Sequence, residues 1–244
     1  MFKVTKSGHI RKGELTTNHG TLKTPFFMPI ATKGSMRAVN TIEVKERLNS
    51  PILLLNTYHL YLRPGSDLVR KLGGLHTFIN WDRPILTDSG GYQVFSLSKM
   101  RKITEEGATF RSHIDGSKHL LTPEESIRTQ FNLGSDIQMV LDECPPGTAS
   151  KYYVEKSLAL TTRWAKRSKE ALEKLYAEES QAEKDRRGMK NKPLQFGIVQ
   201  GGIYEDLRKE SLRQLEEIGF DGYAIGGVSV GESRADVLKV IKWI

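Results

Sequence analysis

Short apolar runs alternate with longer amphipathic segments along most of this chain. Each run is nearly all apolar and is bounded by proline, glycine or asparagine, which is typical of strands buried on both faces. The segments between the runs carry apolar residues at helical spacing. This alternation predicts βαβ units built around a parallel sheet. The expected strands are 26–32, 51–57, 84–90, 137–143, 194–202 and 222–227.

The amphipathic segments also carry the signals that begin helices. Thr122 and Pro123 are followed by Glu124 and Glu125, which places a cap, a proline and two acids at a helix start. Ser233 precedes the last segment in the same way. The expected helices are 68–75, 122–134, 150–176, 204–219 and 233–244.

Two stretches predict antiparallel strands instead. Residues 1–30 contain Gly13 and the turn sequence Asn18-His19-Gly20, which indicates a small β element ahead of the main sheet. Asp115-Gly116 lies between two short runs in residues 108–121, and this dipeptide is typical of a hairpin turn. We therefore expect an inserted hairpin there.

Polar or backbone-exposing residues stand where the predicted strands end. They are Asn56, Asp88, Asp142, Gln200 and the pair Gly226-Gly227. In a (β/α)₈ barrel the carboxyl ends of the strands form the face that holds the active site, so an α/β fold of this TIM-barrel type is the prediction. A doubly wound open sheet also gathers ligands at strand ends and stays an alternative on this pattern alone.

These strand-end residues suit a planar polar ligand such as a purine edge. The two carboxylates accept hydrogen bonds, the two amides both donate and accept them, and glycine lets backbone N–H groups approach closely. Tyr92, just after the Ser89-Gly90-Gly91 turn, adds an aromatic ring on which a base can stack. Each residue alone has a structural explanation, such as a cap or a turn, so the hypothesis depends on the combination.

Composition narrows the class of protein. No apolar run approaches the roughly 18 residues of a membrane span, and the N-terminus lacks the apolar region of a secretory signal. The single cysteine, Cys144, excludes an internal disulfide and a zinc site made of several cysteines. We expect a soluble cytoplasmic protein. The net charge of +8 suits a polyanionic partner, although a solvated helix face in residues 151–192 explains much of the excess equally well.

Five blocks of this sequence together resemble one family. They are "NTYHLYLRPG", "LTDSGGYQVFSL", "VLDECPP", "GIVQGG" and "GYAIGGVSVGE", and the match as a whole runs from about Thr24 to Glu232. These blocks resemble the signature blocks of the tRNA-guanine transglycosylases. The cysteine that follows Asp142-Glu143 and the wording of the last block resemble the bacterial members, and the match corresponds to the N-terminal two-thirds of such an enzyme.

The resemblance implies an activity and residue roles. Members of this family cut the N-glycosidic bond of guanine at the anticodon wobble position of tRNA and install the 7-deazaguanine preQ1, on the route to queuosine. Asp88 matches the family's general acid/base. The residues that match base-binding or supporting positions are Asn56, Ser89, Tyr92, Asp142, Cys144, Gln200, Gly226 and Gly227. The implied partners are tRNA, guanine or preQ1, and a second copy in a homodimer; no membrane is expected.

The sequence also departs from the family pattern. The family's covalent nucleophile is a further aspartate on a later strand, and its zinc site uses three cysteines and one histidine; neither has a match here. The Zn²⁺ ligands would lie after Ile244, so no residue of this chain is expected to bind metal. We expect a single domain at 1–244, a partial barrel of about six of the eight βα units, as a fragment or a shortened product.

Two other functions stay open. A chain with the base pocket but without the nucleophile and zinc ligands suits a non-catalytic tRNA-binding or partner subunit, although Asp88 argues against it. A barrel enzyme that acts on a small phosphorylated sugar explains the acids at the strand ends, but it explains neither Tyr92 nor the basic balance.

Overall fold

Five strands form a parallel sheet in the computed structural model, which describes residues 2–7, 10–97 and 101–244. Their order in the sheet is β11-β10-β9-β5-β4, and each of the β4–β5, β5–β9 and β10–β11 pairs is parallel. The mixed α/β class and the parallel sheet are confirmed; closure into a barrel stays a prediction. The strands are β4 (Leu53–Leu55), β5 (Ile85–Thr87), β9 (Ile137–Met139), β10 (Leu194–Val199) and β11 (Gly222–Ile225).

The first predicted strand, residues 26–32, is wrong as a full strand. Ile30 forms only an isolated parallel bridge with Leu54. Ala31 N–H donates to the Leu54 carbonyl at 2.8 Å, and Leu54 N–H donates to the Pro29 carbonyl at 3.0 Å. Proline has no N–H to donate, so Pro29 within this segment and Pro25 just before it interrupt a regular ladder.

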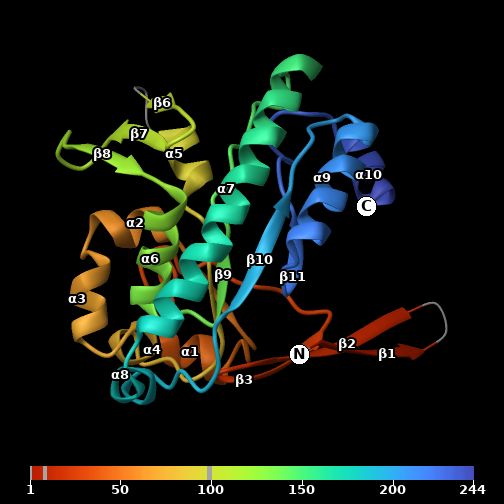
Figure 1. Ribbon diagram of the computed structural model, residues 1–244. Coiled ribbons are helices and arrows are strands. Elements are labelled where there is room, and N and C mark those ends of the chain that lie inside the picture. Colours follow the sequence, from red (N-terminus) through yellow and green to blue (C-terminus); the bar gives the residue numbers. More distant parts are fainter. Residues whose placement is uncertain (1, 8–9, 98–100) are drawn as a thin grey trace. The chain divides into compact units, whose positions relative to one another are not determined.

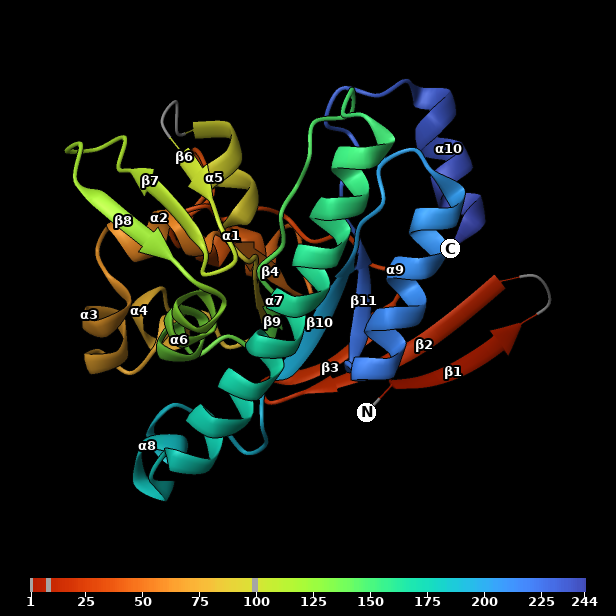
Figure 2. The ribbon, with the colours of Figure 1, turned by 45° about the horizontal axis from the view of Figure 1, so that its top comes forward.

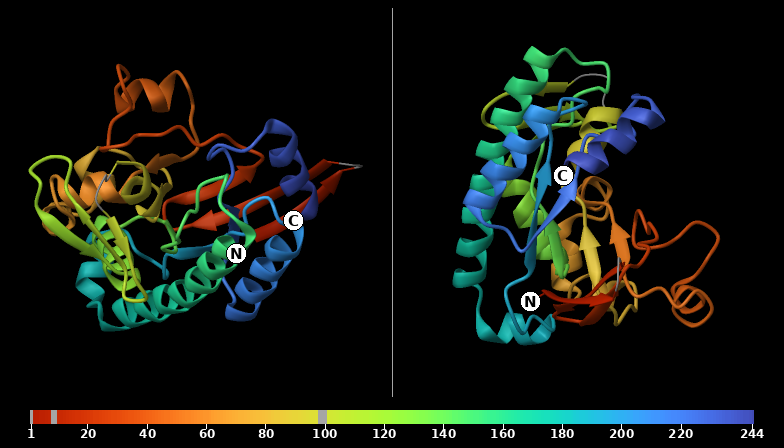
Figure 3. Two further views of the ribbon diagram at one scale, coloured as in Figure 1. Left: turned by 90° about the horizontal axis from the view of Figure 1, so that it is seen from above. Right: turned by 90° about the vertical axis from the view of Figure 1, so that its right-hand side faces the viewer.

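Helices fill most of the segments between the strands. The predicted segment 68–75 divides into two short helices, and the other predicted helices begin and end within two residues of the expected bounds. Thr122 Oγ1 accepts from Glu125 N–H at 3.1 Å and Ser233 Oγ accepts from Asp236 N–H at 3.2 Å, so both predicted caps are confirmed. Figure 3 shows α7 as one unbroken helix, in green to cyan. The helices are α1 (Thr41–Glu46), α2 (Thr57–Leu62), α3 (Ser66–Lys71), α4 (Leu75–Phe78), α5 (Gly91–Leu97), α6 (Pro123–Leu133), α7 (Lys151–Glu178), α8 (Gln181–Arg186), α9 (Glu205–Ile218) and α10 (Arg234–Trp243).

Two small antiparallel sheets accompany the parallel one, as predicted. Figure 1 shows the first of them, in red, near the N-terminus. The second contains the expected hairpin and one further strand, and α5 lies beside it in Figure 2. Gly116 has φ +76° at the tip of this hairpin, a conformation that glycine adopts without steric cost. The strands are β1 (Phe2–Ser7), β2 (Ile10–Thr17), β3 (Gly20–Thr24), β6 (Arg101–Ile103), β7 (Ala108–Arg111) and β8 (Lys118–Leu121).

The chain groups into two compact units, each with its own apolar contacts. A buried cluster in the first unit includes Leu53, Leu55, Trp81 and Ile85. Val154 and Leu158 of α7 pack against Leu207 of α9 in the second unit. Among the described residues no helix has the length and apolar character needed to cross a bilayer. The first unit comprises residues 1–88, 128–138 and 172–194, and the second comprises 89–127, 139–171 and 195–244.

Candidate functional site

Asn56 and Asp88 lie together in the first unit, at the ends of β4 and β5. Asn56 caps α2 by accepting from His59 N–H at 3.1 Å, and its Nδ2 donates to Asp88 Oδ2 at 2.5 Å. The backbone N–H of Thr57 donates to the other carboxylate oxygen at 2.9 Å. The paired parallel strands therefore bring these two predicted residues together. Both Asp88 oxygens have a donor that fixes the orientation of the carboxylate.

A second carboxylate, Asp142, is held in the second unit by two predicted residues. Ser89 Oγ donates to Asp142 Oδ1 at 3.0 Å, and Gln200 Nε2 donates to Oδ2 at 2.7 Å. All three side chains are buried, with Asp142 8% exposed. Ser89 Oγ also accepts from Gly91 N–H at 3.2 Å, which is why the chain turns immediately after Ser89.

Burial decides the protonation of Asp142. Loss of water raises the pKa of this carboxyl above its usual value, and the hydrogen bonds from Gln200 and Ser89 oppose the rise without cancelling it. New N–H donors from a ligand would favour the ionised carboxylate. The Asp142 carboxyl is thus suited to accept hydrogen bonds from the N–H groups of a bound base.

Gln200 has one polar atom that lacks a partner within the described chain. Its Oε1 is buried and accepts no hydrogen bond there, while its Nε2 is used by Asp142. A Cβ at Gly227 would lie 2.3 Å from this oxygen, and Gly227 has φ +58°, so only glycine fits beside it. A buried acceptor without a donor costs about 1–3 kcal/mol, and a ligand N–H would remove that cost.

Arg208 of α9, which the sequence did not single out, organises the same strand ends. It is fully buried, and burial lowers its pKa to about 10, so the guanidinium remains charged at neutral pH. Helical spacing in the sequence could have indicated that Arg208 is buried, because Arg208 shares the buried face of α9 with Ser211 and Leu215. Its donors bond the backbone carbonyls at 2.5–3.0 Å, namely those of Val199, Gly202, Gly226 and Gly227.

The glycine pair Gly226-Gly227 therefore contributes its carbonyls to Arg208. Gly226 N–H is also used, because it donates to the Val199 carbonyl at 3.0 Å. These contacts hold the loop after β11 against the end of β10 within the second unit. The backbone at this pair is thus fixed in place beside Gln200.

Tyr92 and Cys144 differ in exposure. Tyr92 in α5 is 48% exposed, so much of this residue is open to solvent. Cys144 is buried, and burial raises the pKa of its thiol to about 12, which keeps it protonated. Cys144 and Asp142 both line a cavity of about 20 Å³, enough for about one water molecule. Among the described residues the side chains that hydrogen-bond the Asp142 carboxylate are those of Ser89 and Gln200, not Tyr92 or Cys144.

The antiparallel sheet β6-β7-β8 of the second unit, here called the hairpin sheet, has a hollow lined by basic residues. It has a volume of about 510 Å³ and is lined mainly by cations from β6, β7 and β8. A hollow of this charge attracts phosphate groups. The lining side chains are Arg101, Lys102, Thr109, Phe110, Arg111 and Lys118.

Comparison with known proteins gives a consistent family. A family model described as TGT, queuine tRNA-ribosyltransferase, matches residues 6–244. A protein named queuine tRNA-ribosyltransferase from Solidesulfovibrio magneticus is 55% identical over 234 residues, which is 96% of this chain and 59% of that protein. The resemblance based on the five sequence blocks is therefore confirmed.

Two further relatives carry the same name. The one from Fusobacterium nucleatum is 53% identical over 241 residues, which is 98% of this chain and 60% of that protein. The one from Neisseria meningitidis is 52% identical over 245 residues, covering 99% of this chain and 62% of that protein. The chain thus spans 59% to 62% of the length of these curated relatives.

Replacing Arg208 tests whether it holds the strand ends in place. Arg208→Met keeps the length of the side chain and removes all its donors, and hydrogen bonds to charged groups are worth about 1.5–3 kcal/mol each. We expect the free energy of unfolding in urea to fall by roughly 3 kcal/mol or more. Arg213→Met is the control, since Arg213 pairs with Glu210 and Glu217 on the exposed face of the same helix. Equal losses in the two variants would contradict the role of Arg208.

The raised pKa of Asp142 predicts a pH-dependent stability. A carboxyl whose pKa is higher in the folded state stabilises the fold fully below its unfolded pKa, and this contribution is lost as the pH rises through the folded value. Asp142→Asn keeps the shape of the side chain and stays neutral. We expect this variant to gain stability relative to the unmodified chain between about pH 4 and pH 7, measured by urea unfolding. A constant difference over that range would show that Asp142 has an ordinary pKa.

Proposed function

We propose that this chain, which belongs to the queuine tRNA-ribosyltransferase family, carries the guanine-binding residues of a tRNA-guanine transglycosylase. The reaction proposed is exchange of guanine at the anticodon wobble position for a 7-deazaguanine, preQ1, in queuosine biosynthesis. The enzyme class is a pentosyltransferase.

The proposal depends most on two buried hydrogen-bond acceptors, those of Asp142 and Gln200. The Asp142 carboxylate and the unpartnered Gln200 Oε1 are buried acceptors in the second unit, joined through Gln200 Nε2. Guanine presents adjacent N–H donors at N1 and N2, whereas adenine presents an acceptor at N1. Two neighbouring acceptors therefore suit a guanine or a 7-deazaguanine edge. Tyr92, with its exposed ring, is proposed to stack on the base.

Asp88 is proposed as the general acid/base. Cleavage of an N-glycosidic bond develops positive charge on the ribose and requires control of the proton on the leaving base. The Asn56 amide and the Thr57 N–H fix both oxygens of the Asp88 carboxylate, so proton transfer from it would have a defined direction. Ser89 and Cys144 are proposed to support the base-binding groups, Ser89 through its bond to Asp142.

The proposed macromolecular partner is tRNA. The basic hollow of the hairpin sheet supplies Arg101, Lys102, Arg111 and Lys118 around one concave surface, and the net charge of the chain is +8. Phosphate contacts of this kind position an RNA without reading its sequence. A homodimer and a cytoplasmic location are proposed on the resemblance to the family.

The family's zinc does not fit this chain. The site implied by the resemblance uses three cysteines and one histidine, whereas this sequence has one cysteine. Cys144 is buried, and the high pKa of its thiol opposes the thiolate that zinc requires. No step of the proposed reaction is assigned to that metal.

Labelled guanine incorporated into unmodified tRNA tests the proposal. The assay uses chain 1–244 and, if the coding sequence continues, the longer protein. Asp88→Asn is expected to lower exchange by at least about 100-fold, because general acid–base catalysis contributes about 10²–10⁴-fold. Guanine binding should survive, since the change keeps the shape of the side chain.

Asp82→Asn is the matched control, because the Asp82 side chain is 66% exposed and pairs with Lys45 in the same unit. This variant should keep full exchange. Unchanged exchange in Asp88→Asn would remove Asp88 from the acid/base role. Binding of tRNA without exchange by any form of the protein would favour a non-catalytic tRNA-binding subunit instead.

A further inference from the structure

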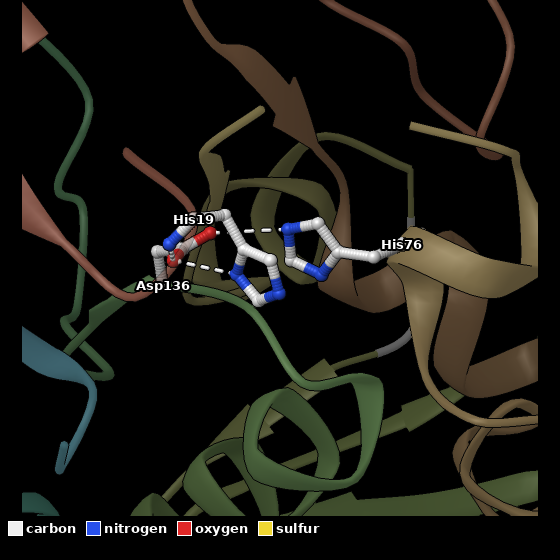
Figure 4. A group of neighbouring side chains, drawn as sticks. All are labelled: His19, His76 and Asp136. Atoms are coloured by element: carbon white, nitrogen blue, oxygen red, sulfur yellow. Dashed lines mark hydrogen bonds and ion pairs between the residues drawn. The ribbon is translucent and has the colours of Figure 1, made fainter. Parts of the chain in front are cut away.

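Three side chains that are distant in sequence meet in the first unit (Figure 4). His19 lies in the turn between β2 and β3, His76 lies in α4, and Asp136 immediately precedes β9. His19 and Asp136 are separated by 117 positions, and His76 and Asp136 by 60. One ligand atom from each residue lies within 4.8 Å of the others.

The Asp136 carboxylate is the centre of this cluster. Its side chain is fully buried, and His19 Nδ1 and His76 Nε2 lie 2.9 and 3.1 Å from its two oxygens. The backbone N–H of His19 and that of Ile85 also donate to it, at 3.0 and 2.9 Å. Burial raises the pKa of Asp136, but the hydrogen bonds from the two histidines outweigh it and hold the pKa well below its usual range. The carboxylate is therefore ionised and held in place by the backbone.

The His76 ring faces more hydrogen-bond acceptors than a neutral imidazole can supply with N–H groups. Burial is the main reason that the pKa of His76 is lowered, although its bond to Asp136 opposes this. The His76 ring faces two acceptors, Asp136 and the backbone at Arg83, and a neutral imidazole carries only one N–H. The rings of His19 and His76 stack with their centroids 3.5 Å apart, so the two imidazoles lie side by side at the carboxylate.

An open groove leads to the cluster. His19 and His76 line a hollow of about 620 Å³ in the first unit, together with Lys45, Glu46, Trp81 and Asp82 among others. The His19 and His76 side chains are 18% and 11% exposed, so an ion and its water ligands could reach the ring nitrogens from this side. A metal site needs such an entry path.

We propose that His19 Nδ1, His76 Nε2 and the Asp136 carboxylate bind one divalent transition-metal ion such as Zn²⁺. Two imidazoles and one carboxylate are a ligand set that Zn²⁺ and related ions accept, and water from the groove completes the coordination. The backbone N–H groups of His19 and Ile85 orient the carboxylate, as outer hydrogen bonds do in known metal sites.

This site is independent of the proposed base exchange and of the cysteine-containing zinc site that the resemblance implies. The bound ion would tie the β2–β3 turn, α4 and the start of β9 to one another. A bound ion would also match the two contacts of the His76 ring. The ion would take the place of the proton at Nε2, and the single N–H of the neutral ring would then donate to the backbone at Arg83. Binding would weaken in acid, where the imidazoles are protonated.

Metal titration of the untagged chain 1–244 tests the proposal. The chain is treated with a chelator, dialysed, and titrated with ZnCl₂ or CoCl₂. We expect one equivalent to bind, visible absorption bands to appear with Co²⁺, and the melting temperature to rise with Zn²⁺ concentration. His19→Gln and His76→Gln should each lower the affinity by at least about 100-fold, since even the outer partners of a metal ligand contribute about 10- to 100-fold.

The control is His113→Gln, which changes an exposed histidine of the second unit and should leave the affinity unchanged. Histidine ¹H–¹⁵N spectra of the unmodified chain give a second readout if a variant fails to fold. Zn²⁺ should shift the resonances of two of the six histidines. Any of three results would overturn the proposal and leave a purely structural cluster. These are the absence of stoichiometric binding, an affinity in the His19 or His76 variant equal to that of the unmodified chain, and histidine resonances that Zn²⁺ does not shift.

Discussion

Charged side chains removed from water must be surrounded by groups of opposite polarity, because an unpaired buried ion costs several kcal/mol. Each unit of this chain is built around such groups. In the first unit Asp136 accepts from two backbone N–H groups and two histidines. In the second unit Arg208 donates to four carbonyls. The Asp136 contacts fix the start of β5, whereas the Arg208 contacts fix the ends of β10 and β11. The base-binding residues of the second unit depend on the backbone that Arg208 fixes.

The binding groups of the second unit follow from this arrangement. Arg208 holds the loop after β11, and that loop places Gly227 against Gln200. Gln200 in turn holds Asp142 and keeps one acceptor unused. A polar pocket that is partly unsatisfied without its ligand discriminates strongly, since a ligand that lacks the matching N–H leaves the buried acceptor unpaired. Guanine specificity is proposed on this physical ground and on the family match.

Local patterns predicted much of the fold. Short apolar runs gave the five parallel strands, and Thr122 and Ser233 marked real helix starts. The strand at 26–32 failed because Pro29 has no N–H to give to a ladder, and short helices such as α2 and α5 have too few turns to show a helical period. The pairs Asn56–Asp88 and Asp142–Gln200 were foreseeable from strand ends. The His19, His76 and Asp136 cluster was not, because no local pattern links residues so far apart.

Equilibrium dialysis of labelled guanine and adenine against chain 1–244 measures whether Asp142 and Gln200 form a guanine-selective pair of acceptors. We expect guanine to bind and adenine to bind at least about 100-fold more weakly, since a site built to hydrogen-bond a ligand rejects analogues that lack the matching donors. We also expect Asp142→Ala to lose this preference. Equal binding of the two bases, or guanine binding unaffected by Asp142→Ala, would show that these two side chains do not select the base.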